Sequence, residues 1–90
     1  MVMYRVIFSR QALKDRDKIL SAGLGAKVKK LAQVLAENPF MNPPPYEKLS
    51  GDLKGYYSRR INRQHRLVYE VIESEKAVHV LTLWTHYENI

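Results

Sequence analysis

Apolar and polar residues alternate mainly with the periodicity of helices in the first half of this chain and with that of strands in the second. Apart from Arg5, residues 3–8 are apolar, β-branched or aromatic, and they contain no breaker, which predicts a short strand. Ser9 then stands where an N-cap is expected, and residues 10–22 follow a helical pattern. The apolar face predicted for that helix comprises Ala12, Leu13, Ile19 and Leu20. The opposite, charged face comprises Lys14, Asp15, Arg16, Asp17 and Lys18.

A second helix is predicted from about Leu24 to Glu37, after a corner supplied by Gly23 and Gly25. Its apolar stripe comprises Leu24, Val28, Leu31 and Leu35. Its lysines are either a solvated helix face or a nucleic-acid or antagonist contact: Lys27, Lys29 and Lys30. Asn38-Pro39 ends the helix, and residues 40–46, with three consecutive prolines, form a stiff connector that delivers Glu47 to a fixed place.

Three strands are predicted in the second half, after a loop over residues 47–55. They cover residues 56–61, 65–72 and 77–86, and polar turns at 62–64 and 73–76 separate them. In the last strand, one face comprises Val78, Val80, Thr82, Trp84 and His86, and the other His79, Leu81, Leu83 and Tyr87. The order strand–helix–helix–strand–strand–strand predicts a single α+β domain over residues 1–90, with two helices on one face of a small, mostly antiparallel sheet.

Composition adds a preference for anionic partners. The chain has 90 residues, a formal charge of +6 and a pI of about 9.7, which favours nucleic acid, an acidic protein segment or an anionic surface. It has no cysteine, its three histidines lack zinc-site spacing, and no run is long enough to span a membrane. We therefore expect a cytoplasmic protein without a cofactor or metal.

Candidate chemistry comes from Glu47, Arg66 and His86. A carboxylate, a guanidinium and an imidazole can together cut a phosphodiester: one takes a proton, one holds the charged phosphorus centre and one returns a proton. Arg66 could instead only pair with Glu70 or Glu73. The remaining histidines are interpreted as structural, and Tyr57 and Trp84 are placed mainly in the core.

The chain resembles the YoeB/Txe branch of the RelE toxin superfamily. The resemblance covers nearly the whole chain, and its specific part comprises Glu47-x-Leu49-x-Gly51-x-Leu53-x-Gly55-x-Tyr57-Ser58-Arg59-Arg60-Ile61, His65-Arg66-Leu67-Val68-Tyr69 and His86-Tyr87. It implies a RelE-like, microbial-ribonuclease-like fold and a ribosome-dependent endoribonuclease that cuts mRNA in the A site. Such toxins are held inactive by a cognate antitoxin from the same operon.

The resemblance also assigns roles to individual residues. It makes Glu47 the general base, Arg66 the phosphate and transition-state binder, His86 the general acid, and Tyr87 an orienting or stacking residue. The RNA or phosphate contacts it implies are Lys48, Lys54, Arg59 and Arg60. This chain departs from the family pattern in two places. Ser50 stands where a lysine is common, so the cation there must come from Lys48 or Lys54, and residues 88–90 extend past His86-Tyr87.

The expected partners are mRNA, the 70S ribosome and an acidic, partly disordered YefM/Axe-like antitoxin. Operator DNA would be bound only through that antitoxin, and a homodimer is compatible with the sequence. We hypothesise that the antitoxin tail covers or displaces Arg59, Arg60, Arg66 and His86. Two other functions stay open: a non-catalytic ParE-like toxin that binds DNA gyrase, and a plain RNA-binding domain. Neither of these would use Glu47, Arg66 and His86 together.

Overall fold

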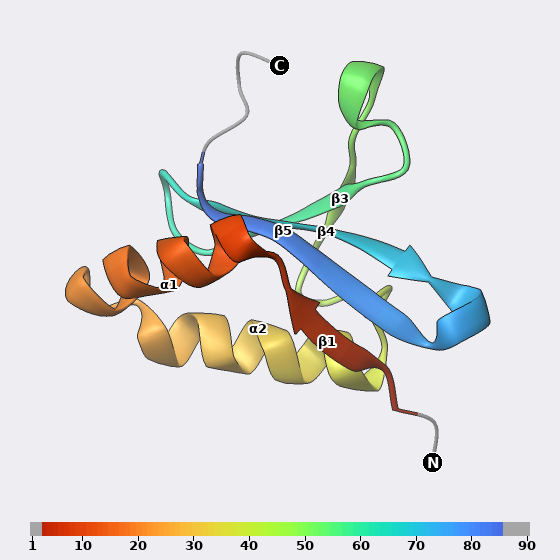
Figure 1. The fold of residues 1–90 in the computed structure, drawn as a ribbon, viewed down its shortest axis with the longest axis horizontal. Coiled ribbons are helices and arrows are strands. Elements are labelled where there is room, and N and C mark those ends of the chain that lie inside the picture. Colours follow the sequence, from red (N-terminus) through yellow and green to blue (C-terminus); the bar gives the residue numbers. More distant parts are fainter. Residues whose placement is uncertain (1–2, 86–90) are drawn as a thin grey trace.

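The computed structural model describes residues 3–85, with two helices packed on one face of a five-stranded sheet (Figure 1). The described elements are β1 (Arg5–Phe8), α1 (Arg10–Ser21), α2 (Gly25–Glu37), β2 (Glu47–Lys48), β3 (Tyr57–Arg60), β4 (Arg66–Ile72) and β5 (Ala77–Thr85). The strands lie in the order β1-β5-β4-β3-β2. Within the described range β1 runs parallel to β5 and the other pairings are antiparallel, so the predicted α+β class and mostly antiparallel sheet are confirmed.

The helices begin and end largely where the sequence indicates. The Ser9 hydroxyl accepts a hydrogen bond from the Ala12 N–H at 3.0 Å and caps α1 as predicted. Gly23 has a φ of +76°, a left-handed conformation that ends the helix at little cost for glycine. A Cβ on Gly25 would lie 2.7 Å from the Leu20 Cδ2 atom, the end of an exposed side chain that has room to move, so glycine is a close fit here and not a strict requirement.

The apolar stripe of α2 is confirmed, whereas the predicted buried face of α1 is confirmed for Ala12 and Ile19 and wrong for Leu13 and Leu20. Ala12, Asp15 and Ile19 are the buried residues of α1, whereas Leu13 and Leu20 are 44% and 60% exposed. The spacing of three and four residues from Ala12 to Ile19 forms one helical stripe, and the acidic residue in its middle interrupts the apolar pattern. The Asp15 carboxylate accepts a hydrogen bond from the Leu83 N–H at 3.1 Å.

The predicted alternation along the last strand is interrupted in β5. Tyr69 pairs with Val80 and Val68 with Thr82, so β5 has an extra residue there, and a second irregularity follows before Arg66 and Thr85. Val78, Val80 and Leu83 are therefore all buried, although Leu83 was assigned to the opposite face. The freed Leu83 N–H is the group that Asp15 binds.

The loop predicted after the connector is partly wrong, and the placement of two aromatic residues is confirmed. Residues 47–55 are not all loop, because Glu47 and Lys48 form β2 against β3 and a 3₁₀ turn covers Gly51–Leu53. Tyr57 and Trp84 pack against the core as predicted. No helix in the described part of the chain is long and apolar enough to cross a membrane.

Candidate active site

Three neighbouring strands bring Glu47 and Arg66 together. Glu47 on β2 pairs with Ser58 on β3, and the next pairings place Arg60 opposite Arg66 on β4. Since side chains two residues apart in a strand share a face, Glu47, Ser58, Arg60 and Arg66 leave the sheet on the same side. A carboxylate and two guanidinium groups thus lie on one surface, although they are up to 19 residues apart in sequence.

The central contact of this surface is an ion pair. The Arg66 Nη1 atom donates to the Glu47 Oε1 atom at 2.5 Å and lies 3.3 Å from the Ser58 hydroxyl. The Arg66 side chain is 26% exposed and that of Glu47 64%, so both can be reached from solvent. The salt bridge to Glu70 or Glu73 that the sequence left open is not the one formed.

The third predicted catalytic group follows directly after this surface. Thr85, the last residue of β5, pairs with Arg66 in the sheet. His86 and Tyr87 lie outside the described residues. The backbone of the residue that precedes His86 is nevertheless fixed opposite Arg66, the cation of the Glu47–Arg66 pair.

Arg59 corrects the prediction that it contacts RNA directly. Its side chain is 1% exposed, and its guanidinium donates to the backbone carbonyl of Pro39, just before the connector, and to those of Met41 and Pro44 within it. Arginine at consecutive positions of a strand must point to opposite faces, so only one of Arg59 and Arg60 can join the Glu47 surface. Arg60 is the exposed one.

Lys48 and Lys54 lie apart from the ion pair. Lys48 follows Glu47 in β2, so its side chain leaves from the opposite face of that strand. Both lysines line a hollow of about 530 Å³, together with residues 49–50 and 55–57. The structure therefore groups these two predicted contacts with each other and not with Glu47.

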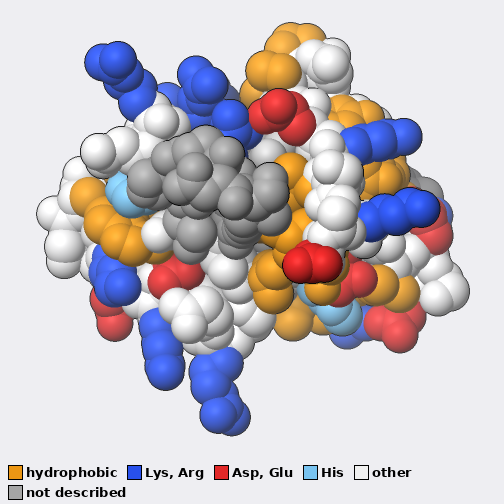
Figure 2. Space-filling view, turned by 90° about the horizontal axis from the view of Figure 1, so that it is seen from above, with side chains coloured by type: hydrophobic (Ala, Val, Ile, Leu, Met, Phe, Trp, Pro, Cys, Tyr) orange, Lys and Arg blue, Asp and Glu red, His pale blue; other side chains and the backbone are white. Residues whose placement is uncertain are grey.

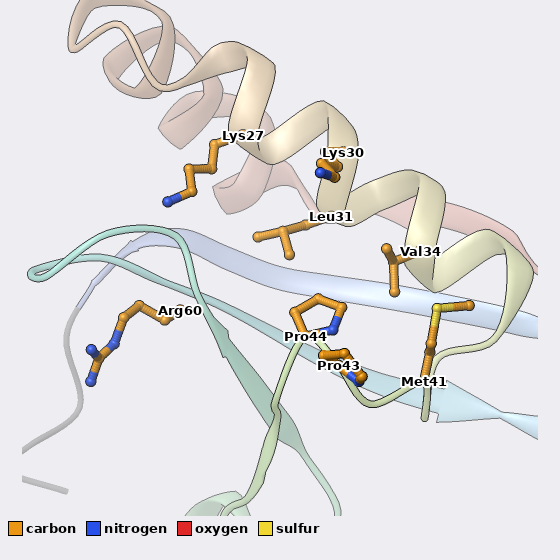
Figure 3. Close-up of a pocket in the computed structure, with 8 residues that line it drawn as sticks. All are labelled: Lys27, Lys30, Leu31, Val34, Met41, Pro43, Pro44 and Arg60. Carbon is orange, nitrogen blue, oxygen red and sulfur yellow. The ribbon is translucent and has the colours of Figure 1, made fainter.

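A second hollow lies between α2 and the connector, with a volume of about 550 Å³ (Figure 3). Its apolar floor comprises Leu31, Val34, Met41, Pro43 and Pro44. Its basic residues are Lys27, Lys30 and Arg60, and the Arg60 guanidinium points away from α2 in Figure 3. Lys27 and Lys30 thus remain open to solvent beside an apolar groove.

The remaining titratable groups near the site have structural surroundings. His65 is 8% exposed and stacks on Trp84, with ring centroids 3.8 Å apart. Burial raises the pKa of the Tyr69 phenol to about 12, and its hydroxyl donates to the Pro39 carbonyl. Among the described residues, no group of three or more His, Cys, Asp or Glu side chains could hold a metal ion.

Comparison with known proteins gives this arrangement a family. Residues 8–87 match the family model of the YoeB-like toxin of bacterial type II toxin–antitoxin systems. The chain belongs to this family. Its fold agrees with that of a YoeB/ParE toxin from Agrobacterium tumefaciens, with a TM-score of 0.83 and 29% identity over 92% of this chain and 99% of that one.

Two further relatives are similar to this YoeB-like toxin. A Toxin YoeB from Streptomyces coelicolor is 38% identical over 52 residues, which are 58% of this chain and 62% of that relative, so the match spans about three-fifths of its length. The toxin in a heterotetrameric YoeB–YefM toxin–antitoxin complex from Staphylococcus aureus is 32% identical, with a TM-score of 0.77 over 93% of this chain and 98% of that one.

One residue of the site, Ser58, was given no role from the sequence of this YoeB-like toxin. Ser58 is 1% exposed, pairs with Glu47 and contacts Arg66 through its hydroxyl. A serine within a strand motif is a weak signal, and only its register between Glu47 and Arg66 reveals its place. The short β2 strand that sets this register was itself predicted as loop.

Proposed function

We propose that this YoeB-like toxin is an endoribonuclease that cuts mRNA in the ribosomal A site without using a metal ion. The observation that carries the proposal is the solvent-accessible Glu47–Arg66 pair, with the residue before His86 fixed opposite Arg66. Neither a gyrase-binding toxin nor a plain RNA-binding domain needs a carboxylate held beside a guanidinium at this point. The family resemblance supports the same assignment.

In the proposed reaction, the Glu47 carboxylate takes the proton from the 2′-hydroxyl of the nucleotide before the cut. The resulting oxygen attacks the adjacent phosphorus, and Arg66 stabilises the additional negative charge on the phosphoryl oxygens. His86 donates a proton to the departing 5′-oxygen, with Tyr87 orienting the imidazole or stacking on a base. The products are a 2′,3′-cyclic phosphate and a 5′-hydroxyl, and DNA, which lacks the 2′-hydroxyl, resists cleavage.

The ion pair suggests how substrate activates the base. In the free protein the Glu47 carboxylate accepts from Arg66 Nη1. A scissile phosphate competes for the same guanidinium, because a bidentate arginine–phosphate contact is strong. Phosphate binding then frees the carboxylate for the 2′-hydroxyl at the moment when the substrate is in place.

An antitoxin partner is part of the proposal. The Staphylococcus relative forms a complex with the antitoxin YefM. For this chain we propose an acidic, partly disordered antitoxin segment that folds over the exposed cations Arg60 and Arg66. Arg59 is removed from the surface that the antitoxin is expected to mask, because its guanidinium is buried.

The deciding experiment is induced expression of the wild type beside Glu47→Gln and His86→Gln, with primer extension on a reporter mRNA. We expect growth arrest with new 5′ ends near the start codon for the wild type and loss of both in the two variants. A general acid or base contributes a factor of about 10² to 10⁴. Arrest that persists in the variants without new RNA ends would instead indicate a gyrase-type or purely binding toxin.

A further inference from the structure

The connector that precedes Glu47 is held by a single buried arginine. The Arg59 guanidinium donates through Nη2 to the Pro39 carbonyl at 3.0 Å and to the Met41 carbonyl at 2.9 Å, and through Nη1 to the Pro44 carbonyl. These carbonyls span most of the segment between the end of α2 and β2. Arg59 therefore fixes a stretch of chain that has no sheet or helix hydrogen bonds of its own.

Aromatic rings enclose the same guanidinium. Its central carbon lies 5.1 Å from the Tyr46 ring centroid and 5.9 Å from that of Tyr69, distances typical of cation–π contacts. The Tyr69 hydroxyl donates to the Pro39 carbonyl at 2.8 Å, a carbonyl that Arg59 also binds. In the described part of the chain Arg59 forms no ion pair, so a buried charge is stabilised by connector carbonyls and rings alone.

Arg59 reaches Glu47 by two short routes. Tyr46, whose ring faces the guanidinium, is the residue directly before Glu47. Ser58, directly before Arg59 on β3, is the residue that pairs with Glu47. Arg59 thus contacts the residue before Glu47 and adjoins the residue that pairs with Glu47. Its own side chain nevertheless points to the opposite face of the sheet.

We propose that Arg59 is a positioning residue for Glu47. It fixes the connector so that the carboxylate lies against Arg66 and within reach of the 2′-hydroxyl. This inference rests on the proposed endoribonuclease function and adds to it a residue that never touches RNA. Lysine cannot replace Arg59, because an ammonium group is a point charge without the planar fork that reaches several separate carbonyls.

The test compares Arg59→Lys with the wild type in single-turnover cleavage of mRNA on programmed 70S ribosomes. At saturating ribosomes we expect the cleavage rate constant to fall by about 10- to 100-fold, since a small misplacement of a catalytic group costs this much. Because Arg59 is buried, we expect the affinity for the ribosome to stay within about twofold of the wild type. Arg63→Lys, at an exposed arginine of the β3–β4 turn, is the matched control and should change neither quantity.

A double-mutant cycle separates positioning from general damage. If Arg59 acts through Glu47, then Arg59→Lys in a Glu47→Gln background should slow the residual cleavage by less than about threefold. The reaction is followed for hours, because loss of a general base slows it by about 10² to 10⁴. An equal loss in both backgrounds, or a weakened affinity for the ribosome, would overturn the proposal.

Tyr69→Phe provides a milder variant should Arg59→Lys fail to fold. It removes only the hydroxyl that donates to the Pro39 carbonyl, so its smaller loss of cleavage should also disappear in the Glu47→Gln background. Thermal unfolding of each variant establishes that it is folded. A wild-type protein that cuts no RNA would refute the proposed function. If the wild type cuts RNA but the effects of the Arg59 and Glu47 substitutions on the cleavage rate are independent of each other, only the role of Arg59 is refuted.

Discussion

At the scale of single residues, two buried polar side chains decide how the chain is held near the site. Asp15 and Arg59 are 2% and 1% exposed, and each satisfies backbone groups where regular hydrogen bonding is interrupted. Asp15 accepts the Leu83 N–H at the irregular end of β5, and Arg59 donates to the carbonyls of the connector. Since buried polar groups need partners, these residues belong to the framework that presents Glu47 and the end of β5.

Asp15 should therefore contribute strongly to stability. Asp15→Ala leaves the Leu83 N–H without its acceptor and removes a hydrogen bond to a charged group, so we expect the free energy of unfolding to fall by about 2–3 kcal/mol. Asp17→Ala, at an exposed acid in the same helix, should stay within about 0.5 kcal/mol. Urea unfolding followed by circular dichroism measures both. Equal effects of the two substitutions would show that the buried contact is unimportant.

At the scale of elements, strongly periodic segments were predictable and irregular ones were not. The stripe of Val28, Leu31 and Leu35 in α2 is confirmed, because four- and three-residue spacings need no knowledge of the partner surface. The face of the sheet to which Leu83 points could not be predicted. An extra residue in β5 shifts the alternation of side chains, and this irregularity has no signature in the sequence. The two-residue strand β2 exists only through pairing with β3, a long-range effect that local pattern does not contain.

The same limits apply to the candidate site. Glu47 and Arg66 were identified from their chemistry and from the family resemblance, and the structure brings them into contact. Arg59 was assigned to phosphate, because the sequence does not say which of two adjacent arginines faces the interior. Only burial and the connector carbonyls distinguish them. The roles of Glu47, Arg66 and His86 in cleavage stay predictions.

The β4–β5 hairpin should make stability depend on acid pH. The Tyr4 hydroxyl donates to Glu73 at 2.7 Å and Lys76 forms an ion pair with it at 3.0 Å, which ties the chain before β1 to this turn. The Tyr4 hydrogen bond, and then that of Lys76, lower the pKa of Glu73 below its ordinary value of 4.5. As pH falls, Glu73 therefore binds a proton in the unfolded chain before it does so in the folded protein. This stabilisation is complete above pH 4.5 and is lost as pH falls through the lowered pKa of Glu73 in the folded state.

Glu73→Gln tests this dependence. The variant lacks the carboxylate, so the wild type should be more stable than the variant above pH 4.5, and the difference should shrink as pH falls below it. The effect should be modest, because both charged side chains are more than half exposed. Glu75→Gln, in the same turn, is the control, and urea midpoints at several pH values are the measurement. A difference that is independent of pH would contradict the assignment.

At the scale of the whole molecule, most positive charge lies around the proposed catalytic surface and not at its centre. The chain carries a formal charge of +6, and Lys and Arg side chains project around the edge of the face shown in Figure 2. Such charges attract RNA over a distance but do not choose where it is cut. Cleavage would instead depend on Arg66 of β4 and Glu47 of β2, the two strands that flank β3.

This division of roles predicts how RNA binding responds to salt. Arg60 shares the face of Glu47 and Arg66, whereas Lys14 lies on the exposed side of α1 in the helical layer. Each phosphate contact on single-stranded RNA adds about 0.7 to the slope of log affinity against log salt concentration, so Arg60→Ala should lower that slope by about this amount. Lys14→Ala should leave it unchanged if RNA follows the catalytic face.

Fluorescence anisotropy with a labelled single-stranded RNA, titrated at several salt concentrations, measures these slopes. Each nucleotide of the probe carries a 2′-O-methyl group, which blocks attack by the 2′-oxygen, so that the proposed cleavage cannot consume the RNA during the titration. Equal reductions for Arg60→Ala and Lys14→Ala would mean that the net charge binds RNA diffusely over the whole surface. A selective reduction for Arg60→Ala would instead place the RNA backbone along β3, where Arg60 lies opposite Arg66 and two pairings from Glu47.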